Sequence, residues 1–224
     1  MKLYSERSEW KNYMQLISQR PKDFAPSEIF TIVTDERDVN RFFEETGKML
    51  GVIYKSEYHI LLVDLIRSPE GRLYTYERIL LTEDNAIVAM TVQDGKFVLL
   101  KQYRHSMRGS QYAFPRGFGE KGISARENVC KEVQEELGAQ VHSICHLGNV
   151  IADSGLSGNA AQIYLCKVSH IQKKQWYEGI EDIILLSPEE IEHEIAAGNI
   201  TDGYTLAAYT FYKCKYYISE EASC

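Results

Sequence analysis

A glycine-rich segment that runs directly into a well-capped helix constrains this chain of 224 residues more than any other feature. The segment, residues 114–122, reads Phe-Pro-Arg-Gly-Phe-Gly-Glu-Lys-Gly. Such loops let the main chain approach a phosphate or a metal ion closely, because glycine has no side chain to block it. Ser124 and Glu127 then form the pattern of a capping box, and Gly138 stands where a left-handed helix end belongs. We therefore predict a helix over residues 125–137.

Three glutamates share one face of this predicted helix. Glu132, Glu135 and Glu136 fall within an arc of about 100° at the helical repeat of 3.6 residues per turn. A glutamate-rich helix face is usually just solvated. Three carboxylates this close repel one another, however, unless a cation lies among them, and hard oxygen ligands suit magnesium or manganese. Because the glycine-rich loop leads directly into this helix, we favour a metal site over a solvated face.

Residues 117–139 resemble the Nudix box, whose signature is Gly-x5-Glu-x7-Arg-Glu-apolar-x-Glu-Glu-x-Gly-apolar. The spacing matches throughout, but Ile123 stands in place of the first glutamate and Lys131 in place of the arginine. In the family these two residues pair and brace the loop against the helix, so their replacement removes a brace and no metal ligand. We expect Lys131 to be held in an ion-pair ladder with Glu127 and Glu135, each four residues away.

The resemblance implies a magnesium-dependent hydrolase, with manganese as an alternative metal, whose ligands are Glu132, Glu135 and Glu136. In the family a main-chain carbonyl at the place of Arg116 is a further metal ligand. Arg116 stands where a small residue is usual, and its side chain would add a cation beside the substrate. We therefore expect Arg116 and Gly117 to belong to the substrate-binding surface as well.

The resemblance covers residues 58–212 and is closest to the ADP-ribose pyrophosphatase branch of the family. The sequence Gln-Tyr-Arg ending at Arg104 looks like the end of a strand in that branch, where the arginine holds the substrate. We therefore expect Arg104 to contact the phosphates of the substrate. The alternative is that Arg104 is an ordinary surface arginine. Residues 177–183 resemble the acidic loop that supplies a catalytic base. Either Glu178 or Glu181 fits this role, and spacing alone does not choose between them.

Residues 151–157 resemble the Tyr-Pro-Ser-Pro-Gly loop of that branch, but Ser154 replaces the proline before the glycine. Because that proline marks the ADP-ribose specificity, we expect a nucleoside diphosphate derivative as substrate: ADP-ribose, another sugar nucleotide or a dinucleotide. The products would be two phosphate monoesters. Two other functions remain open, a catalytically idle Nudix domain that senses a nucleotide or regulates a partner, and a Nudix-fold isomerase that uses different acid and base residues.

Strand and helix patterns predict an α+β Nudix fold, with a mixed β-sheet between helices, an N-terminal extension and a β-hairpin. One hairpin joins residues 58–66 to 72–81 through Ser-Pro-Glu-Gly, and a second joins 86–92 to 96–102 through Asp-Gly. Further strands are predicted at 141–151, 160–168 and 181–186, and helices begin after Ser187 and near Thr205.

We divide the chain into an N-terminal extension of unreadable role (1–50), a β-hairpin segment (51–82) and a Nudix catalytic domain (83–224). Relatives dimerise by exchanging an N-terminal sheet, so the resemblance implies a homodimer. The net charge of -7 and the scattered basic residues argue against a nucleic-acid partner. Because the sequence has neither an apolar leader nor a long apolar stretch, we expect a soluble cytoplasmic protein without a membrane partner.

Overall fold

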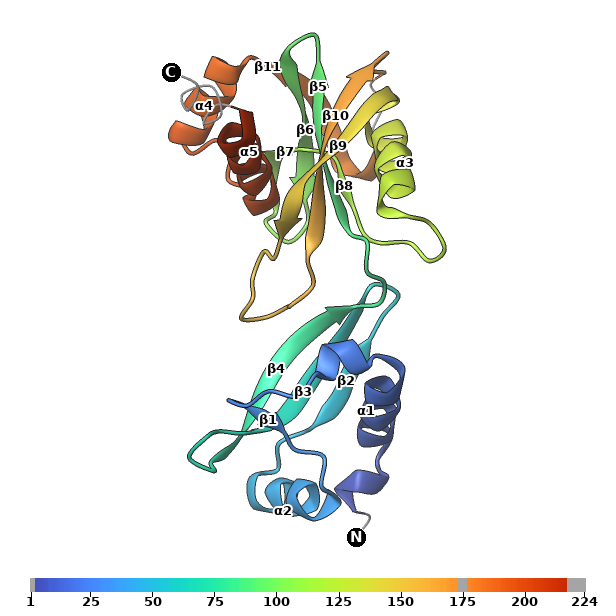
Figure 1. Cartoon of the computed structure of the whole chain (residues 1–224), viewed down its shortest axis with the longest axis vertical. Coiled ribbons are helices and arrows are strands. Elements are labelled where there is room, and N and C mark those ends of the chain that lie inside the picture. Colours follow the sequence, from blue (N-terminus) through green and yellow to red (C-terminus); the bar gives the residue numbers. More distant parts are fainter. Residues whose placement is uncertain (1–2, 173–176, 217–224) are drawn as a thin grey trace. The chain divides into compact units, whose positions relative to one another are not determined.

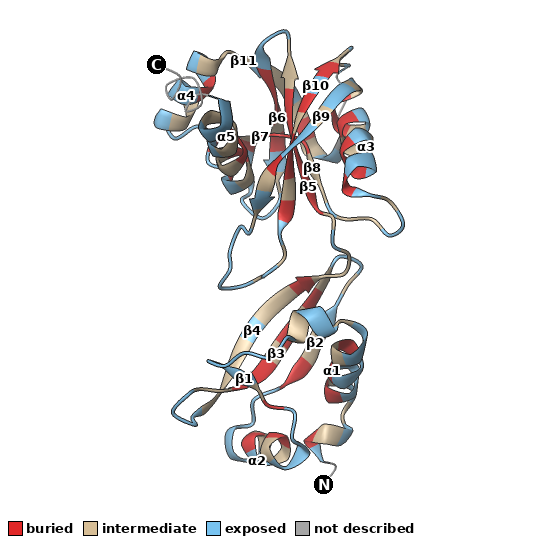
Figure 2. Cartoon of the chain, in the orientation of Figure 1, coloured by how far each residue is buried: buried red, intermediate tan, exposed pale blue. Residues whose placement is uncertain are grey.

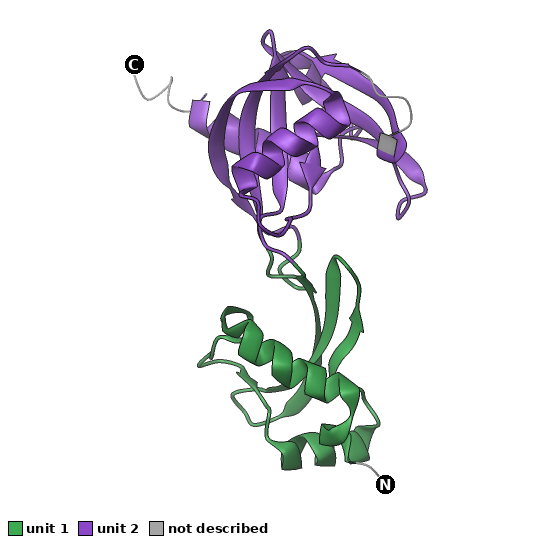
Figure 3. Ribbon diagram, turned by 90° about the vertical axis from the view of Figure 1, so that its right-hand side faces the viewer, with its two compact units in different colours: residues 1–82, 153–159 green, residues 83–152, 160–224 purple. Residues whose placement is uncertain are grey.

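The computed structural model describes residues 3–172 and 177–216 (Figure 1). Its contacts divide the chain into two compact units (Figure 3). The N-terminal unit comprises residues 1–82 together with 153–159, and the remainder forms the C-terminal unit. The first fifty residues thus share one unit with the hairpin segment, whereas we had divided them from it.

The N-terminal unit packs two helices on a four-stranded antiparallel sheet. Its helices are α1 (Ser8–Gln19) and α2 (Glu36–Thr46), its strands are β1 (Thr31–Ile32), β2 (Gly51–Lys55), β3 (His59–Arg67) and β4 (Leu73–Leu81), and η1 (Tyr4–Glu6) and η2 (Pro21–Phe24) are short 3-10 turns. Strand β3 pairs with each of the other three strands. The β3–β4 hairpin was predicted from its turn sequence, and the structure confirms it.

A buried polar cluster ties the first fifty residues to this hairpin. The side chain of Asp64, in β3, is buried and accepts hydrogen bonds from the hydroxyl of Tyr13, in α1, and from Nε of Arg78, in β4, the latter at 2.5 Å. A buried carboxylate is costly unless it is paired in this way. Trp10 and Leu16 pack beside Tyr13 in the same apolar core. The extension is therefore a structural part of the N-terminal unit.

The C-terminal unit is built on a seven-stranded mixed sheet. Its strands are β5 (Ile87–Gln93), β6 (Lys96–Arg104), β7 (Gly109–Ala113), β8 (Arg116–Gly117), β9 (Gln140–Val150), β10 (Ala161–Ser169) and β11 (Ile180–Leu186), and its helices are α3 (Ala125–Leu137), η3 (Tyr177–Gly179), α4 (Pro188–Ala196) and α5 (Gly203–Tyr216). The main order is β11-β6-β5-β10-β9, and only the β5–β10 pair is parallel among the described strands. The short strands β7 and β8 pair with β6 and β5.

Helices cover both faces of this sheet, as the predicted fold requires (Figure 2). On one face, Val129, Val133 and Leu137 of α3 join the buried cluster of the sheet. On the other face, the ring of Phe97 contacts Tyr209 of α5 edge-on, at 5.5 Å between centroids. Alternation along β6 explains this division, because neighbouring residues of a strand point to opposite faces.

The predicted helices and hairpins of this unit are confirmed. Helix α3 has the predicted bounds and a complete capping box, and Asp94 and Gly95 both adopt positive φ in the tight turn between β5 and β6. Strands β2, β7 and β8 were not predicted from the sequence. They are short, and β8 has only two residues, too few for an alternating pattern to be visible. No helix in the described part of the chain is both long and apolar enough to cross a membrane.

Candidate active site

The loop before α3 is fixed to that helix by two of the predicted glutamates. Glu136 accepts a hydrogen bond from the main-chain N–H of Arg116 at 3.1 Å. The carboxylate of Glu132 lies against Gly117, where an added Cβ would come within 1.8 Å of its Oε1 atom. Any side chain at position 117 would therefore displace the Glu132 carboxylate from the space that it occupies. The loop and the acidic face of α3 thus meet at residues 116 and 117.

Burial makes these carboxyl groups hard to ionise. Desolvation, reinforced by the charge of Glu135, raises the pKa of Glu132 to about 7. Desolvation, reinforced by the charge of Glu132, raises the pKa of Glu136 to about 8. Buried carboxylates of like charge favour a cation in their midst, because it would offset both the desolvation and the repulsion. The arrangement of charges therefore suits a divalent metal.

No three His, Cys, Asp or Glu side chains within residues 3–172 and 177–216 form a ready metal cluster. The carboxylate of Glu136 is turned to the N–H of Arg116, and that of Glu135 is 3.9 Å from Nζ of Lys131. The fit to a metal therefore rests on the donor chemistry: buried oxygen donors from Glu132 and Glu136, with Glu135 at the rim, and a glycine that opens the main chain to them.

The two candidate bases occupy different surroundings. Glu178 adopts a left-handed conformation with φ of 46°, and its main-chain carbonyl accepts a hydrogen bond of 2.9 Å from the buried Gln102. Its charge acts on two of the three metal-ligand candidates, because it contributes to the raised pKa of Glu132 and of Glu136. Glu178 therefore belongs electrostatically to the glutamate cluster.

Glu181 is engaged elsewhere. Its Oε1 accepts a hydrogen bond of 2.6 Å from Ser110, and its Oε2 lies 3.4 Å from Nζ of Lys101. The bond from Ser110, together with the lysine, lowers the pKa of Glu181. Lys101 follows Leu100, which packs towards α3, so alternation sends Lys101 to the opposite face of the sheet. The structure thus groups Glu178, and not Glu181, with the glutamates of α3.

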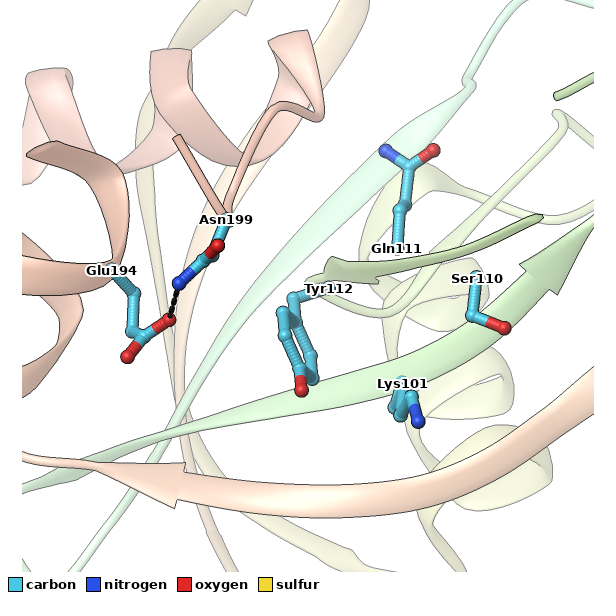
Figure 4. Close-up of a pocket in the computed structure, with 6 residues that line it drawn as sticks. All are labelled: Lys101, Ser110, Gln111, Tyr112, Glu194 and Asn199. Carbon is cyan, nitrogen blue, oxygen red and sulfur yellow. Dashed lines mark hydrogen bonds between the residues drawn. The ribbon is translucent and has the colours of Figure 1, made fainter. Parts of the chain in front are cut away.

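A cavity of about 380 Å³ opens beside Ser110 and Lys101, the two residues that contact Glu181 (Figure 4). Lys101, Ser110 and Tyr112, from the β6–β7 hairpin, line one side of it, and Glu194 and Asn199 line the other. Asn199 donates a hydrogen bond of 2.7 Å to Glu194. The cavity thus lies beside Glu181 and contains none of the α3 glutamates among its lining residues.

Arg104 is a positively charged residue whose buried nitrogen atoms lack partners. Its Nε and Nη2 atoms are buried and have no hydrogen-bond partner. Burial and the nearby charge of Arg116 lower its pKa, against the opposing charges of Glu136 and other acidic groups. Buried polar groups are rarely left unpaired in folded proteins, so an unpaired guanidinium beside an acidic cluster is suited to an anionic ligand.

The side chain of Arg116 is not free in the way that the sequence analysis expected. Its Nη1 forms a 2.6 Å ion pair with Asp202, and its guanidinium lies 5.1 Å from the ring centroid of Tyr204. Asp202 is 6% exposed in its side chain, so the pair is largely withdrawn from water. The cation at Arg116 is therefore already neutralised by a neighbouring carboxylate.

These observations agree with comparisons to known proteins. The sequence profile of the NUDIX domain family matches residues 81–208, more than half of the chain. The chain belongs to the NUDIX domain family. It is 26% identical over 175 residues to the methanol dehydrogenase activator of Bacillus methanolicus, which covers 76% of this chain and 93% of that protein.

A solved structure shares the fold. The crystal structure of an ADP compounds hydrolase aligns with a TM-score of 0.62 at 14% sequence identity, over 78% of this chain and 98% of the other. At this identity the likeness shows the Nudix fold and not the substrate. The α+β fold that the Nudix resemblance implied is thus confirmed.

The structure corrects our expectation for the altered Nudix box. Lys131 forms an ion pair with Glu120, in the loop, and is 3.9 Å from Glu135. Glu127 does not join this ladder, because its carboxylate accepts the N–H of Ser124 at 2.7 Å in the capping box. The loop is therefore still tied to the helix, through a glutamate three positions before the one that the signature specifies.

Of the segment 151–157, which resembles the ADP-ribose marker, residues 153–157 lie in the N-terminal unit. Within that unit, the main-chain N–H of Ile79, in β4, donates to the carbonyl of Leu156 at 2.8 Å, and the hydroxyl of Tyr76 donates to the carbonyl of Gly155 at 2.7 Å. Gly155 follows Ser154, the residue in the proline position. This loop is thus held by main-chain contacts to β4.

Sequence reasoning missed three residues that shape this Nudix site: Glu120, Gln102 and Asp202. Glu120 was visible only as part of the glycine-rich segment, and its partner is eleven residues away. Asp202 and Thr205 have the spacing of a helix cap, which is a signal for the start of α5 but not for a contact with Arg116. These contacts depend on the folding of distant segments against each other.

Proposed function

We propose that this chain is a metal-dependent pyrophosphohydrolase that cleaves the diphosphate linkage of a nucleoside diphosphate derivative, such as ADP-ribose or a related sugar nucleotide, into two phosphate monoesters. The proposal rests on two neighbouring features of opposite charge: the buried, hard-to-ionise glutamates of α3, and the half-buried guanidinium of Arg104, whose Nε and Nη2 atoms have no hydrogen-bond partner. A metal-bound diphosphate would bring a cation to the glutamates and hydrogen-bond acceptors to Arg104. The name of the ADP compounds hydrolase supports an adenosine diphosphate type of substrate.

We assign the metal to Glu132, Glu135, Glu136 and the main-chain carbonyl of Arg116, with Mg²⁺ as the expected ion and Mn²⁺ as an alternative. When bound, such an ion supplies positive charge at the phosphoryl oxygens and makes water more acidic. Gly117 admits the Glu132 carboxylate to the loop, and Glu136 holds the N–H of Arg116. The chain thus brings the oxygen donors to one place, and the carboxylates of Glu135 and Glu136 would turn from Lys131 and from the N–H of Arg116 to bind the ion.

Arg104 and Glu178 complete the assignment. The guanidinium of Arg104 would donate to the diphosphate oxygens and orient the substrate, since its Nε and Nη2 have no other partner. Glu178 would take the proton of the attacking water, because its charge already acts on the glutamates of α3 and Gln102 holds its main chain. We do not assign this role to Glu181, which is paired with Ser110 and Lys101.

A substrate panel tests this proposal. Purified protein would be incubated with ADP-ribose, other nucleoside diphosphate sugars and dinucleotides in the presence of Mg²⁺ or Mn²⁺. The monoester products would be detected by coupling to a phosphatase. We expect metal-dependent release with at least one substrate class, and near-complete loss in Glu136→Gln with a melting temperature no lower than that of the wild type. Substantial activity in that variant would refute the assignment.

A second candidate function is regulation of a partner protein, favoured by one relative. That relative is a methanol dehydrogenase activator by name, and the alignment spans 93% of its length. A catalytically idle Nudix domain that acts as a regulator would bind a nucleoside diphosphate without cleaving it. Calorimetric binding of a panel compound with no product formed in the presence of metal would favour the regulator over the hydrolase.

We also propose that the protein acts as a homodimer through its N-terminal sheet. Several large apolar side chains of that unit are exposed, among them Ile29 at 62% and Tyr54 at 62%. Such surfaces are often covered by a partner. Light scattering coupled to size-exclusion chromatography would test this, and a monomer mass near 25.7 kDa at micromolar concentration would contradict it.

A further inference from the structure

Asp202 is connected by hydrogen bonds to both ends of the segment 114–116, at the start of the glycine-rich loop. Its Oδ1 atom accepts from Nη1 of Arg116 at 2.6 Å. Its Oδ2 atom accepts from both the N–H and the hydroxyl of Thr205, at 3.0 and 2.8 Å. The same threonine hydroxyl then accepts the main-chain N–H of Phe114 at 3.0 Å. One carboxylate is thus connected to residue 116 directly and to residue 114 through Thr205.

The intervening and adjoining groups of this segment are anchored as well. The carbonyl of Pro115 accepts the N–H of Ala89, in β5, at 2.8 Å, and the N–H of Arg116 donates to Glu136 at 3.1 Å. Thr205 and Phe114 are fully buried, and Asp202 is 5% exposed. Because buried hydrogen bonds of this kind fix main-chain positions, the start of α5 sets where the loop stands against α3.

The negative charge of Asp202 also neutralises the guanidinium of Arg116. Arg116 and Arg104 are close enough for the charge of Arg116 to lower the pKa of Arg104. Without Asp202, the largely buried guanidinium of Arg116 would lose its carboxylate partner. We infer that it would then turn to Glu136, which already accepts a hydrogen bond from the main-chain N–H of the same residue. An arginine paired with Glu136 would compete with a metal ion for that ligand. Asp202 keeps the guanidinium of Arg116 paired, so that the carboxylate of Glu136 stays available to a metal ion.

We propose that Asp202 is a positioning residue for the metal site, which holds the 114–117 loop in place and keeps Arg116 away from the metal-binding glutamates. This inference rests on the proposed function, because it takes Glu132, Glu135 and Glu136 as metal ligands. Thr205 is the link through which Asp202 reaches Phe114. Outer residues that orient metal ligands in this manner typically change metal affinity about tenfold to a hundredfold when they are replaced.

The test measures metal binding rather than turnover. Mn²⁺ would be titrated into the metal-free full-length chain, and the free ion would be followed by electron paramagnetic resonance. Asp202→Asn keeps the shape and removes the charge, and Thr205→Val removes the link to Phe114. Ser187→Ala is the matched control, because it removes the capping hydroxyl of the neighbouring helix α4 without touching the loop. The double variant Arg116→Met with Asp202→Asn removes the cation together with its partner.

We expect the dissociation constant for Mn²⁺ to rise about tenfold or more in Asp202→Asn, to rise several-fold in Thr205→Val, and to stay at the wild-type value in Ser187→Ala. The double variant should recover much of the lost affinity, since no freed arginine competes for Glu136. Wild-type affinity in a folded Asp202→Asn would overturn the proposal, as would a double variant that binds no better than the single one. If Asp202→Asn fails to fold, wild-type affinity in Thr205→Val overturns it.

The two proposals fail in different ways. If the wild type binds Mn²⁺ and the variants shift as expected, but no nucleoside diphosphate is cleaved, the proposed hydrolase function is wrong and Asp202 keeps its role. If the wild type cleaves a substrate and Asp202→Asn binds Mn²⁺ unchanged, the function stands and the role of Asp202 is wrong.

Discussion

Lys131, on α3, pairs with Glu120, in the loop before the helix, and not with Glu127 on its own helix. The Nudix signature places a glutamate at position 123, where this chain has isoleucine. The contact between loop and helix is therefore kept while the residue that makes it has moved. The hydrogen bond from Lys131 to Glu120 also raises the pKa of the lysine.

Replacing Glu120 with glutamine should weaken the attachment of the loop without removing a metal ligand. The ion pair is partly exposed, so the expected cost is at most about 1 kcal/mol, or about fivefold in kcat. Lys131→Met should have the same effect, whereas Lys121→Met, a neighbouring cation of the same loop, should not. Steady-state kinetics would measure this. Equal effects of all three variants would show that the pair has no special role.

Gly117→Ala should be far more damaging to activity than to folding. Its Cβ would meet the carboxylate of Glu132 at 1.8 Å and displace it. A misplacement of about 1 Å in a catalytic site can cost about a hundredfold in rate. Gly109→Ala is the control, because its nearest neighbour outside the adjoining residues is 4.0 Å away. Wild-type kcat in Gly117→Ala would contradict the placement of Glu132 against the loop.

Comparing Glu178→Gln with Glu181→Gln decides which residue is the base. Loss of a general base typically costs about a hundredfold to ten-thousandfold in rate, so Glu178→Gln should lose at least a hundredfold in kcat. Glu181→Gln should stay within a few-fold of the wild type, because it faces Ser110 and Lys101. The reverse order would show that Glu181, and not Glu178, is the base.

Arg104→Met should raise the stability of the free protein and weaken its binding of substrate. The methionine would spare the cost of a buried guanidinium that has two nitrogens without partners, about 1 kcal/mol. Loss of its charged hydrogen bonds to the substrate would raise KM about tenfold to a hundredfold. Thermal unfolding and steady-state kinetics would measure the two effects. A lower melting temperature would indicate that Arg104 is satisfied in the free protein.

The metal-free protein should lose stability as the pH rises from about 5 to about 8. Burial raises the pKa of Glu132 to about 7 and of Glu136 to about 8, from an ordinary value of 4.5. Between those values the folded state still binds protons that the unfolded state has released, so each rise in pH favours unfolding. Above pH 8 the folded state carries both charges, and Mg²⁺ should then stabilise it most.

Thermal unfolding of the chelator-treated protein at pH 5.5 and 8.5, with and without Mg²⁺, would measure this effect. The variant Glu132→Gln with Glu136→Gln should flatten the pH dependence and abolish the metal response. A metal response at pH 8.5 that is no larger than that at pH 5.5 would contradict it.

Local sequence determined the framework of the site. The capping box at Ser124 and Glu127, the glycine at 138 and the period of the apolar residues specify α3 without any other part of the chain, because a helix and its caps are made by neighbours in sequence. Helical geometry then places Glu132, Glu135 and Glu136 on one face. The two tight hairpins follow for the same reason, since their turn residues and strands are contiguous.

Tertiary structure decided which of these groups face one another. Glu181 lies at an irregularity in the pairing of β11 with β6, between Ile180 and Asp182, and its carboxylate contacts Ser110 and Lys101. No spacing in the sequence reveals this irregularity. The partners of Lys131 and Arg116 were likewise out of reach, because Glu120 and Asp202 come near them only when the loop and the start of α5 have packed. Charges are visible in a sequence, but their distances and burial arise from folding.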